Sequence, residues 1–162
     1  MRAWIVEQIG IAAVQKQMPD PLPAKGEARI AIAACGLNFA DLLMQDGTYQ
    51  ERPPLPFIPG MEIAGTVLAL GPDTTGPAPG SRVAVLAGRG GLAEQGCFPV
   101  SQLVPLPPSM PFTQAAAFQI AYGTSHLALD HRARLQPGET LLVFGAAGGV
   151  GLIACQWAKA LG

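Results

Sequence analysis

The sequence has few charged residues, no cluster of basic side chains and too few cysteines for a disulfide framework. Charged residues make up 13% of the 162 residues, about half of the share usual in soluble proteins. The formal net charge is −1 and lysine and arginine form no run, which argues against electrostatic binding of nucleic acid. The three cysteines are widely spaced and predict reduced, mostly packed thiols in a cytoplasmic protein.

Signals for export or membrane insertion are also missing. Near the N-terminus, Glu7 interrupts the apolar stretch that a secretory signal needs. Residues 141–158 carry no charge and approach the minimum length of a membrane-spanning helix. Each glycine among them, however, would weaken such a helix by about 1 kcal/mol. We therefore expect no membrane partner.

Glycine and proline are abundant, with 20 and 16 residues respectively. This abundance disfavours a helical bundle, and the 49% of apolar residues disfavours disorder. A weak alternation predicts a strand at 29–34, and short apolar runs bounded by glycine and proline predict strands at 62–70 and 82–86, with a loop at 71–80. Such short strands with turn-rich joints predict a small β-barrel. A short helix is expected at 39–45, with Asn38 as its N-cap.

The pattern changes after Pro111. A helix is expected over 114–118 with Thr113 as its N-cap, and another around 125–134. Residues 140–144 (TLLVF) predict a fully buried strand of the kind found in parallel sheets. Apolar residues then recur at helical spacing over 152–161.

Between this strand and this helix lies the pattern A-x-G-x-x-G at residues 146–151. A strand, a Gly-rich turn and a helix in that order form the phosphate-binding unit of a dinucleotide fold. Gly148 would let a pyrophosphate approach the backbone, and Gly151 would let the helix pack close to the strand. The helix N-terminus would present N–H groups to the anion. The alternative is a packing turn in another α/β domain.

Residues 139–162 supply only one strand–helix unit. A single parallel strand has no neighbour to bond to, so this unit cannot form a stable domain alone. We therefore expect the chain to be the front part of a longer polypeptide.

Taken together, these motifs resemble the quinone oxidoreductase (zeta-crystallin-like) family of the medium-chain dehydrogenase/reductase superfamily. The resemblance rests on CGLNFAD at 35–41 with GTY at 47–49, on PGMEIAG at 59–65, and on the stretch from Gly138 to Lys159 that contains AAGGVG. It implies a mainly β GroES-like catalytic barrel at 1–111 and an inter-domain helical segment at 112–136. The first strand and helix of an incomplete α/β Rossmann domain would then occupy 137–162.

The zinc alcohol dehydrogenases of that superfamily resemble C-G-x-C-x-x-D and G-H-E at two of these places. Here Asn38 replaces the second Cys and Met61 replaces the His, and an amide and a thioether are poor zinc ligands. A substitute metal site made of Cys35, Asp41 and Glu62 is a less favoured alternative.

The resemblance therefore implies an NADPH-dependent, zinc-independent oxidoreductase. Its substrate would be a small quinone or α,β-unsaturated carbonyl, because without a metal the hydride acceptor must itself be electrophilic. A homodimer is implied for the full-length form, and the 162-residue chain alone is expected to be inactive. The alternatives are a non-catalytic GroES-like binding or scaffold module and an enoyl-reductase-type relative.

The resemblance assigns catalytic and cofactor-binding roles to Asn38 and Tyr49. The further cofactor-binding residues that it implies are Thr124, Ala146, Ala147, Gly148, Gly149, Val150 and Gly151. The competing interpretations are a pure helix cap for Asn38 and a packed turn residue for Tyr49, and Asp41 is expected to be a structural hydrogen-bond acceptor. His126 and His131, five positions apart near a helix, are expected on different helix faces as exposed or capping residues.

Overall fold

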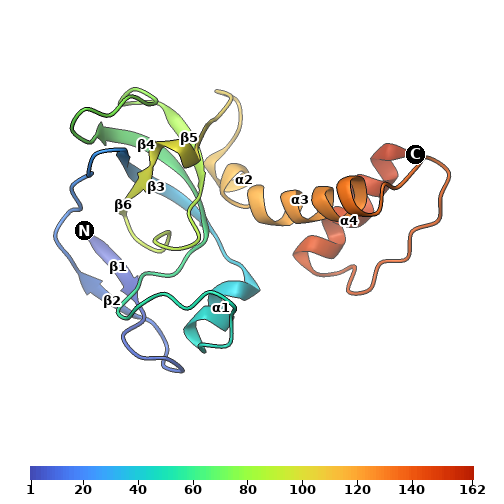
Figure 1. The fold of residues 1–162 in the computed structure, drawn as a ribbon, viewed down its shortest axis with the longest axis horizontal. Helices are drawn as coiled ribbons and strands as arrows, with labels where there is room; N and C mark the ends of the chain where they lie inside the picture. Colours follow the sequence, from blue (N-terminus) through green and yellow to red (C-terminus); the bar gives the residue numbers. More distant parts are fainter. The chain divides into compact units, whose positions relative to one another are not determined.

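A computed structural model describes all residues 1–162, which form two compact units, Met1–Ala117 and Phe118–Gly162. Figure 1 labels most of the helices and strands of both units. The first unit contains β1 (Arg2–Ile5), β2 (Val14–Gln17), β3 (Glu27–Gly36), α1 (Phe39–Gln45), β4 (Glu62–Leu70), β5 (Arg82–Leu86), β6 (Gln95–Pro99), the short 3-10 helix η1 (Val100–Gln102), β7 (Leu103–Pro105) and α2 (Phe112–Ala116). The second contains α3 (Gln119–His126), the π-helical segment η2 (Leu127–Arg132) and α4 (Gly149–Leu161).

The first unit is built on a five-stranded antiparallel sheet in the order β6-β3-β4-β5-β7, with β1 and β2 paired separately. The pairing of β3 with β4 shifts register between Arg29 and Ile30 and again between Ile32 and Ala34. Such irregularities bend a strand and increase its twist, and both strands curl strongly in Figure 1. Bridges from Ala3 to Ala93 and from Val6 to Phe57 attach β1 to this sheet's loops. The predicted small GroES-like barrel is confirmed.

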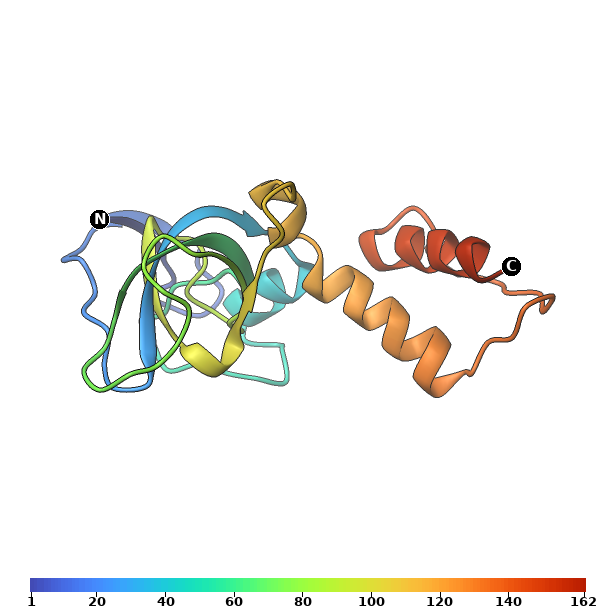
Figure 2. The same cartoon turned by 90° about the horizontal axis from the view of Figure 1, so that it is seen from above.

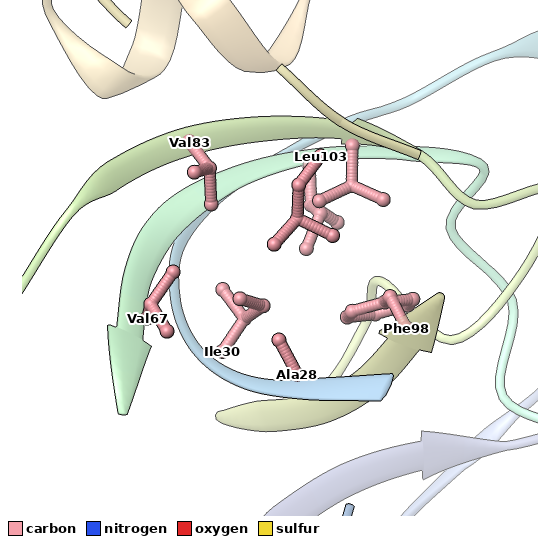
Figure 3. Packing of buried hydrophobic residues seen from close by; sticks show 8 residues of the cluster. Ala28, Ile30, Val67, Val83, Phe98 and Leu103 are labelled. Carbon is pink, nitrogen blue, oxygen red and sulfur yellow. The ribbon is translucent and has the colours of Figure 1, made fainter. Parts of the chain in front are cut away.

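The core lies on the concave side of the curled sheet. Alternate residues of a strand face the same way, and Figure 3 shows those of several strands converging inside the curl. This buried cluster consists of Ala28, Ile30, Ile63, Val67, Val83, Val85, Phe98 and Leu103. It fixes the positions of β3 and β4, whose ends carry the candidate site.

The predicted strands at 62–70 and 82–86 and the predicted helix at 39–45 are confirmed with the same bounds. The strand predicted at 29–34 is longer, Glu27–Gly36. The helix predicted over 114–118 begins two residues earlier and spans Phe112–Ala116, and its N-cap is Pro111 rather than Thr113. The short strands β1, β2, β6 and β7 lack a strong apolar run, and the sequence did not reveal them.

The strand predicted at 140–144 is wrong for this structure, because these residues form no strand. Leu142 and Phe144 are 75% and 89% exposed rather than buried. A strand needs a neighbour to bond its backbone groups, and the second unit contains no other strand.

The helices of the second unit also differ in part from prediction. The helix expected at 125–134 begins at Gln119 and changes from α to π geometry at Leu127. Figure 2 shows α3 and η2 as one continuous rod, which a long irregular loop joins to α4. The helix expected at 152–161 is confirmed as α4. None of these helices combines the length and apolar character needed to cross a bilayer.

Candidate functional site

Asn38 lies between β3 and α1 and is the N-cap residue of that helix, with φ −121° and ψ 150°. Its side-chain Nδ2 donates a hydrogen bond to Glu62 Oε1 at 2.9 Å. Glu62 is the first residue of β4 and only 2% exposed. Because a carboxylate oxygen only accepts, this bond fixes which end of the amide faces Glu62.

Asp41, in the first turn of α1, braces the same corner through both carboxylate oxygens. Oδ2 accepts the Asn38 backbone N–H at 2.9 Å, and Oδ1 accepts the Gly60 N–H at 2.9 Å. Gly60 has φ +100°, a conformation that residues with a side chain rarely adopt. Asp41 is buried, and it has the structural role that we expected for it.

Cys35, at the end of β3, lies close to the carboxylates of Asp41 and Glu62. A Cβ added to Gly60 or Gly91 would lie 2.8 or 2.7 Å from Cys35 Sγ. Burial, and then the negative charges of Asp41 and Glu62, raise the pKa of the Cys35 thiol to about 12. Zinc takes the thiolate form of cysteine, and both oxygens of Asp41 are already engaged. The alternative site of Cys35, Asp41 and Glu62 is therefore poorly arranged for a metal.

Tyr49 follows the C-terminus of α1, and its N–H donates to Leu43 O at 3.1 Å. Its half-buried side chain packs against a small apolar cluster of Val6, Met44 and Phe57. Met61, the residue before Glu62, packs against the same cluster. Tyr49 is thus the packed turn residue that one interpretation expected. Its contact with a cofactor stays a prediction.

A pocket of about 450 Å³ opens beside Asn38 and Asp41. Most of its wall is apolar, including Trp4, Leu37 and Leu42. A pocket with an apolar wall and few polar groups is the usual form of a small-molecule site. A larger pocket of about 660 Å³ lies elsewhere on the barrel, but none of the predicted site residues line it. We therefore regard the pocket at Asn38 as the candidate substrate site.

The Gly-rich turn precedes α4, and Gly148 is the N-cap of that helix. The Gly148 N–H donates to Gly145 O at 3.0 Å, and Leu152 N–H donates to Gly148 O at 2.8 Å. A Cβ on Gly151 would collide with Gly145 O and lie 2.9 Å from Ala146 Cα. Gly151 is therefore needed because the turn folds back onto the first turn of the helix. The close packing of helix on strand that we expected of Gly151 is not seen.

The backbone at the start of α4 is accessible. A Cβ on Gly149 would meet nothing within 4 Å, and one on Gly148 would meet only Gly145 O at 3.4 Å. Ala146, Ala147 and Val150 are exposed. The first N–H groups of a helix have no acceptor within it, so this 13-residue helix fits the phosphates of a dinucleotide. The residues at 146–151 therefore fit the pyrophosphate of a dinucleotide cofactor.

Ser125 is a buried polar residue that the sequence did not reveal. It is 1% exposed, and its Oγ lies 2.9 Å from Ala121 O and 3.0 Å from Val150 O. It therefore connects α3 to the first turn of α4. Its neighbour Thr124, predicted to contact cofactor, is exposed on α3. A single small polar residue carries no pattern that would have identified Ser125.

The interpretation of His126 and His131 as residues on different helix faces is wrong. Their imidazole rings meet edge to face, with centroids 5.5 Å apart. The reason is η2, whose π geometry brings residues five apart onto one face.

Residues 24–108 match the family model of the alcohol dehydrogenase GroES-like domain. A quinone oxidoreductase-like protein 2 homolog of Nematostella vectensis is 47% identical over 133 residues, which are 82% of this chain and 36% of that protein. The human synaptic vesicle membrane protein VAT-1 homolog is 43% identical over 136 residues, 84% of this chain and 35% of that protein.

Among solved structures, the Escherichia coli quinone oxidoreductase complexed with NADPH superposes with a TM-score of 0.94 at 32% sequence identity. The match covers 100% of this chain and 50% of that one. The chain thus spans between about a third and a half of the length of the proteins it resembles.

Proposed function

This chain belongs to the family of proteins with an alcohol dehydrogenase GroES-like domain, and from that premise we propose that it is part of an NADPH-dependent, zinc-independent oxidoreductase. The reaction is transfer of a hydride to a quinone or an α,β-unsaturated carbonyl. Relatives named quinone oxidoreductase, one of them solved with NADPH, support this assignment. The barrel at 1–111 would hold the substrate, 112–136 would connect the domains, and 137–162 would begin the nucleotide-binding domain.

The single observation that carries the proposal is the accessible backbone at the start of α4. Gly148 and Gly149 leave open space where a pyrophosphate would lie, and the helix N-terminus favours negative charge there. Ala146, Ala147, Val150 and Gly151 complete this cofactor-binding turn. NADPH, when bound, supplies the hydride from its nicotinamide ring. Thr124 is proposed to contact the nicotinamide side of the cofactor.

Asn38 is proposed to bind the substrate oxygen. A side-chain amide has two N–H donors, and one of them is held by Glu62. The other is proposed to donate to the carbonyl oxygen, which gains negative charge as the hydride arrives. A fixed donor stabilises such an oxyanion without having to reorganise. With Asn38 and Met61 in the positions of zinc ligands, this hydrogen bond is proposed to replace a Lewis acid.

Tyr49 is proposed to orient the substrate or the nicotinamide, or to supply the proton that completes the reduction. Its phenol can donate as well as accept, and its ring is supported by the cluster of Val6, Met44 and Phe57. The apolar wall of the pocket at Asn38 suits the ring of a quinone. The family resemblance also favours a homodimer in the cytoplasm.

The test uses a polypeptide that extends this chain to the length of its relatives. NADPH and NADH oxidation are compared with a quinone, an enone and a plain aldehyde as acceptors. We expect turnover with NADPH and with the first two acceptors. Asn38→Ala should lower kcat by about a hundredfold or more, the range for loss of an oxyanion donor, and the exposed Gln102→Ala should leave it unchanged. A folded protein that binds no nicotinamide cofactor would instead favour the scaffold module.

A further inference from the structure

Three metal-ligating side chains lie together where α3 passes into η2. His126 ends α3, and Asp130 and His131 lie in η2. Each offers a ligand atom within 4.8 Å of those of the other two, and His126 Nε2 lies 3.8 Å from Asp130 Oδ2. We propose that His126, Asp130 and His131 bind a divalent transition-metal ion of the zinc class, at a site separate from the turn that would bind the cofactor.

The π-helical geometry of η2 creates this arrangement. In an α-helix of 3.6 residues per turn, residues five apart point about 140° away from each other. Here the Ala133 N–H donates to Ala128 O at 2.9 Å, a bond that spans five residues and stacks residues five apart. His131 therefore joins His126 on one face, with Asp130 beside them. Single π-helical turns are rare and often lie at functional sites.

The ligand set and its spacing suit a metal of this class. Two imidazoles and a carboxylate are common ligands of Zn²⁺ and also suit Cu²⁺ and Ni²⁺. Ligand atoms about 2.1 Å from a tetrahedral ion lie about 3.4 Å apart. In this structure the three ligand atoms lie within 4.8 Å of one another. Each distance between two of them must therefore shorten by about 1.4 Å at most when the ion binds. The side chains of His126 and Asp130 are 44% and 53% exposed, so they have room to turn.

The surroundings of His126 set the affinity that we expect. Its Nδ1 is buried and has no hydrogen-bond partner, so no hydrogen bond to that atom fixes the imidazole in one orientation. A metal-bound histidine is normally held by such a bond, and its absence predicts a weaker site than a structural zinc centre. The ring also contacts Trp157 of α4 edge to face, with centroids 5.1 Å apart.

The contact with Trp157 provides the measurement. The chain has two tryptophans, so Trp4→Phe leaves Trp157 as the only one in the full chain. Titration with Cu²⁺, a fluorescence quencher, should quench Trp157 with saturation at one ion per chain, and Zn²⁺ should compete. Circular dichroism and calorimetry with Zn²⁺ alone provide the check on folding and on stoichiometry.

The ligand variants decide the outcome. We expect Zn²⁺ binding to weaken by about tenfold or more in each of His126→Ala, Asp130→Asn and His131→Ala. Loss of a residue that only hydrogen-bonds to a metal ligand already weakens binding by about that much, and loss of the ligand itself should cost at least as much. The exposed Glu51→Gln is the matched carboxylate control and should change nothing. His131→Gln serves as a second variant if the alanine variant loses helicity.

Binding that survives in both His131 variants would overturn the proposal. It would show that His126 and Asp130 alone hold the ion as an ordinary α-helical pair. Quenching that never saturates, or that is equal in all variants, would mean adventitious surface binding and would overturn it as well.

Discussion

The side chain of Asn38 donates a hydrogen bond to that of Glu62 over 2.9 Å, and this bond joins the start of α1 to the start of β4. It places a half-buried amide against a buried carboxylate in the corner that Asp41 and Gly60 complete. In the zinc alcohol dehydrogenase pattern the position of Asn38 carries a cysteine. Here an amide held by a carboxylate is the polar group presented at this corner.

Replacing Glu62 should therefore disturb both stability and the orientation of Asn38. In Glu62→Ala the Asn38 amide loses its acceptor, and we expect a loss of about 1–3 kcal/mol in the free energy of unfolding. Glu62→Gln keeps an acceptor oxygen and should lose less. Urea unfolding of both variants measures the difference. Equal losses in the two variants would show that the hydrogen bond to Asn38 contributes little.

The ionisation of Cys35 should limit stability in alkaline solution. Burial, with Asp41 and Glu62 nearby, raises its pKa from 9.0 to about 12. The unfolded chain therefore loses the Cys35 proton at a lower pH than the folded chain does. The contribution of Cys35 to the free energy of unfolding is thus complete below pH 9 and is lost as the pH rises toward 12. Unfolding of the native chain and of Cys35→Ser between pH 8 and 10.5 should show the steeper decline for the native chain. Parallel declines would contradict the assignment.

The three thiols should also react at different rates with iodoacetamide near pH 8. Cys155 is exposed, whereas Cys35 and Cys97 are partly buried, and burial raises the pKa of both of the latter. Because the thiolate is the nucleophile, Cys155 should be alkylated first and Cys35 last. Mass spectrometry of peptides gives the order directly. Early labelling of Cys35 in the folded chain would be inconsistent with its enclosure by Gly60 and Gly91.

The glycines at the start of α4 form a matched pair. Gly151→Ala places a methyl group against the backbone of Gly145 and Ala146 and should destabilise the turn. Gly149→Ala places it in open space and should stabilise the helix by up to about 1 kcal/mol. The midpoint of thermal unfolding, followed by circular dichroism, should fall in Gly151→Ala and rise in Gly149→Ala. The same direction for both would mean that the turn does not pack on the helix as described.

Ser125 should hold α3 and α4 together through Val150. Ser125→Ala removes a buried hydroxyl that lies 3.0 Å from Val150 O, and such a bond contributes about 1 kcal/mol. Faster hydrogen exchange in α4 is the expected result, with the exposed Gln156→Ala as the control. Unchanged exchange in Ser125→Ala would indicate that apolar packing alone joins these helices.

The 162-residue chain by itself should not oxidise NADPH with a quinone, as its sequence led us to expect. It presents only one helix, α4, of the proposed nucleotide-binding domain, and Leu142 and Phe144, predicted to lie in a buried strand, are exposed. Turnover by this chain at a rate comparable to the extended polypeptide would show that the barrel and the Gly-rich turn suffice.

The sequence by itself determined the elements whose formation depends on nearby residues. Apolar runs between turn residues specified β4 and β5, and the Asn38 cap followed by good helix formers specified α1. The segment at 146–151 likewise specified a Gly-rich turn that leads into a helix. Each of these depends on local backbone preference and on a face that must be buried, and both are written in the order of residues.

Only the tertiary structure decided which distant groups meet. Residues 140–144 have the composition of a buried strand, but a strand forms only where another strand accepts its hydrogen bonds. Asn38 and Glu62 are neighbours because β3 and β4 pair and curl around a common core. His126 and His131 share a face because the helix changes its hydrogen-bond spacing at Leu127. Periodicity assumes one regular geometry, so no pattern in the sequence records a change from α to π.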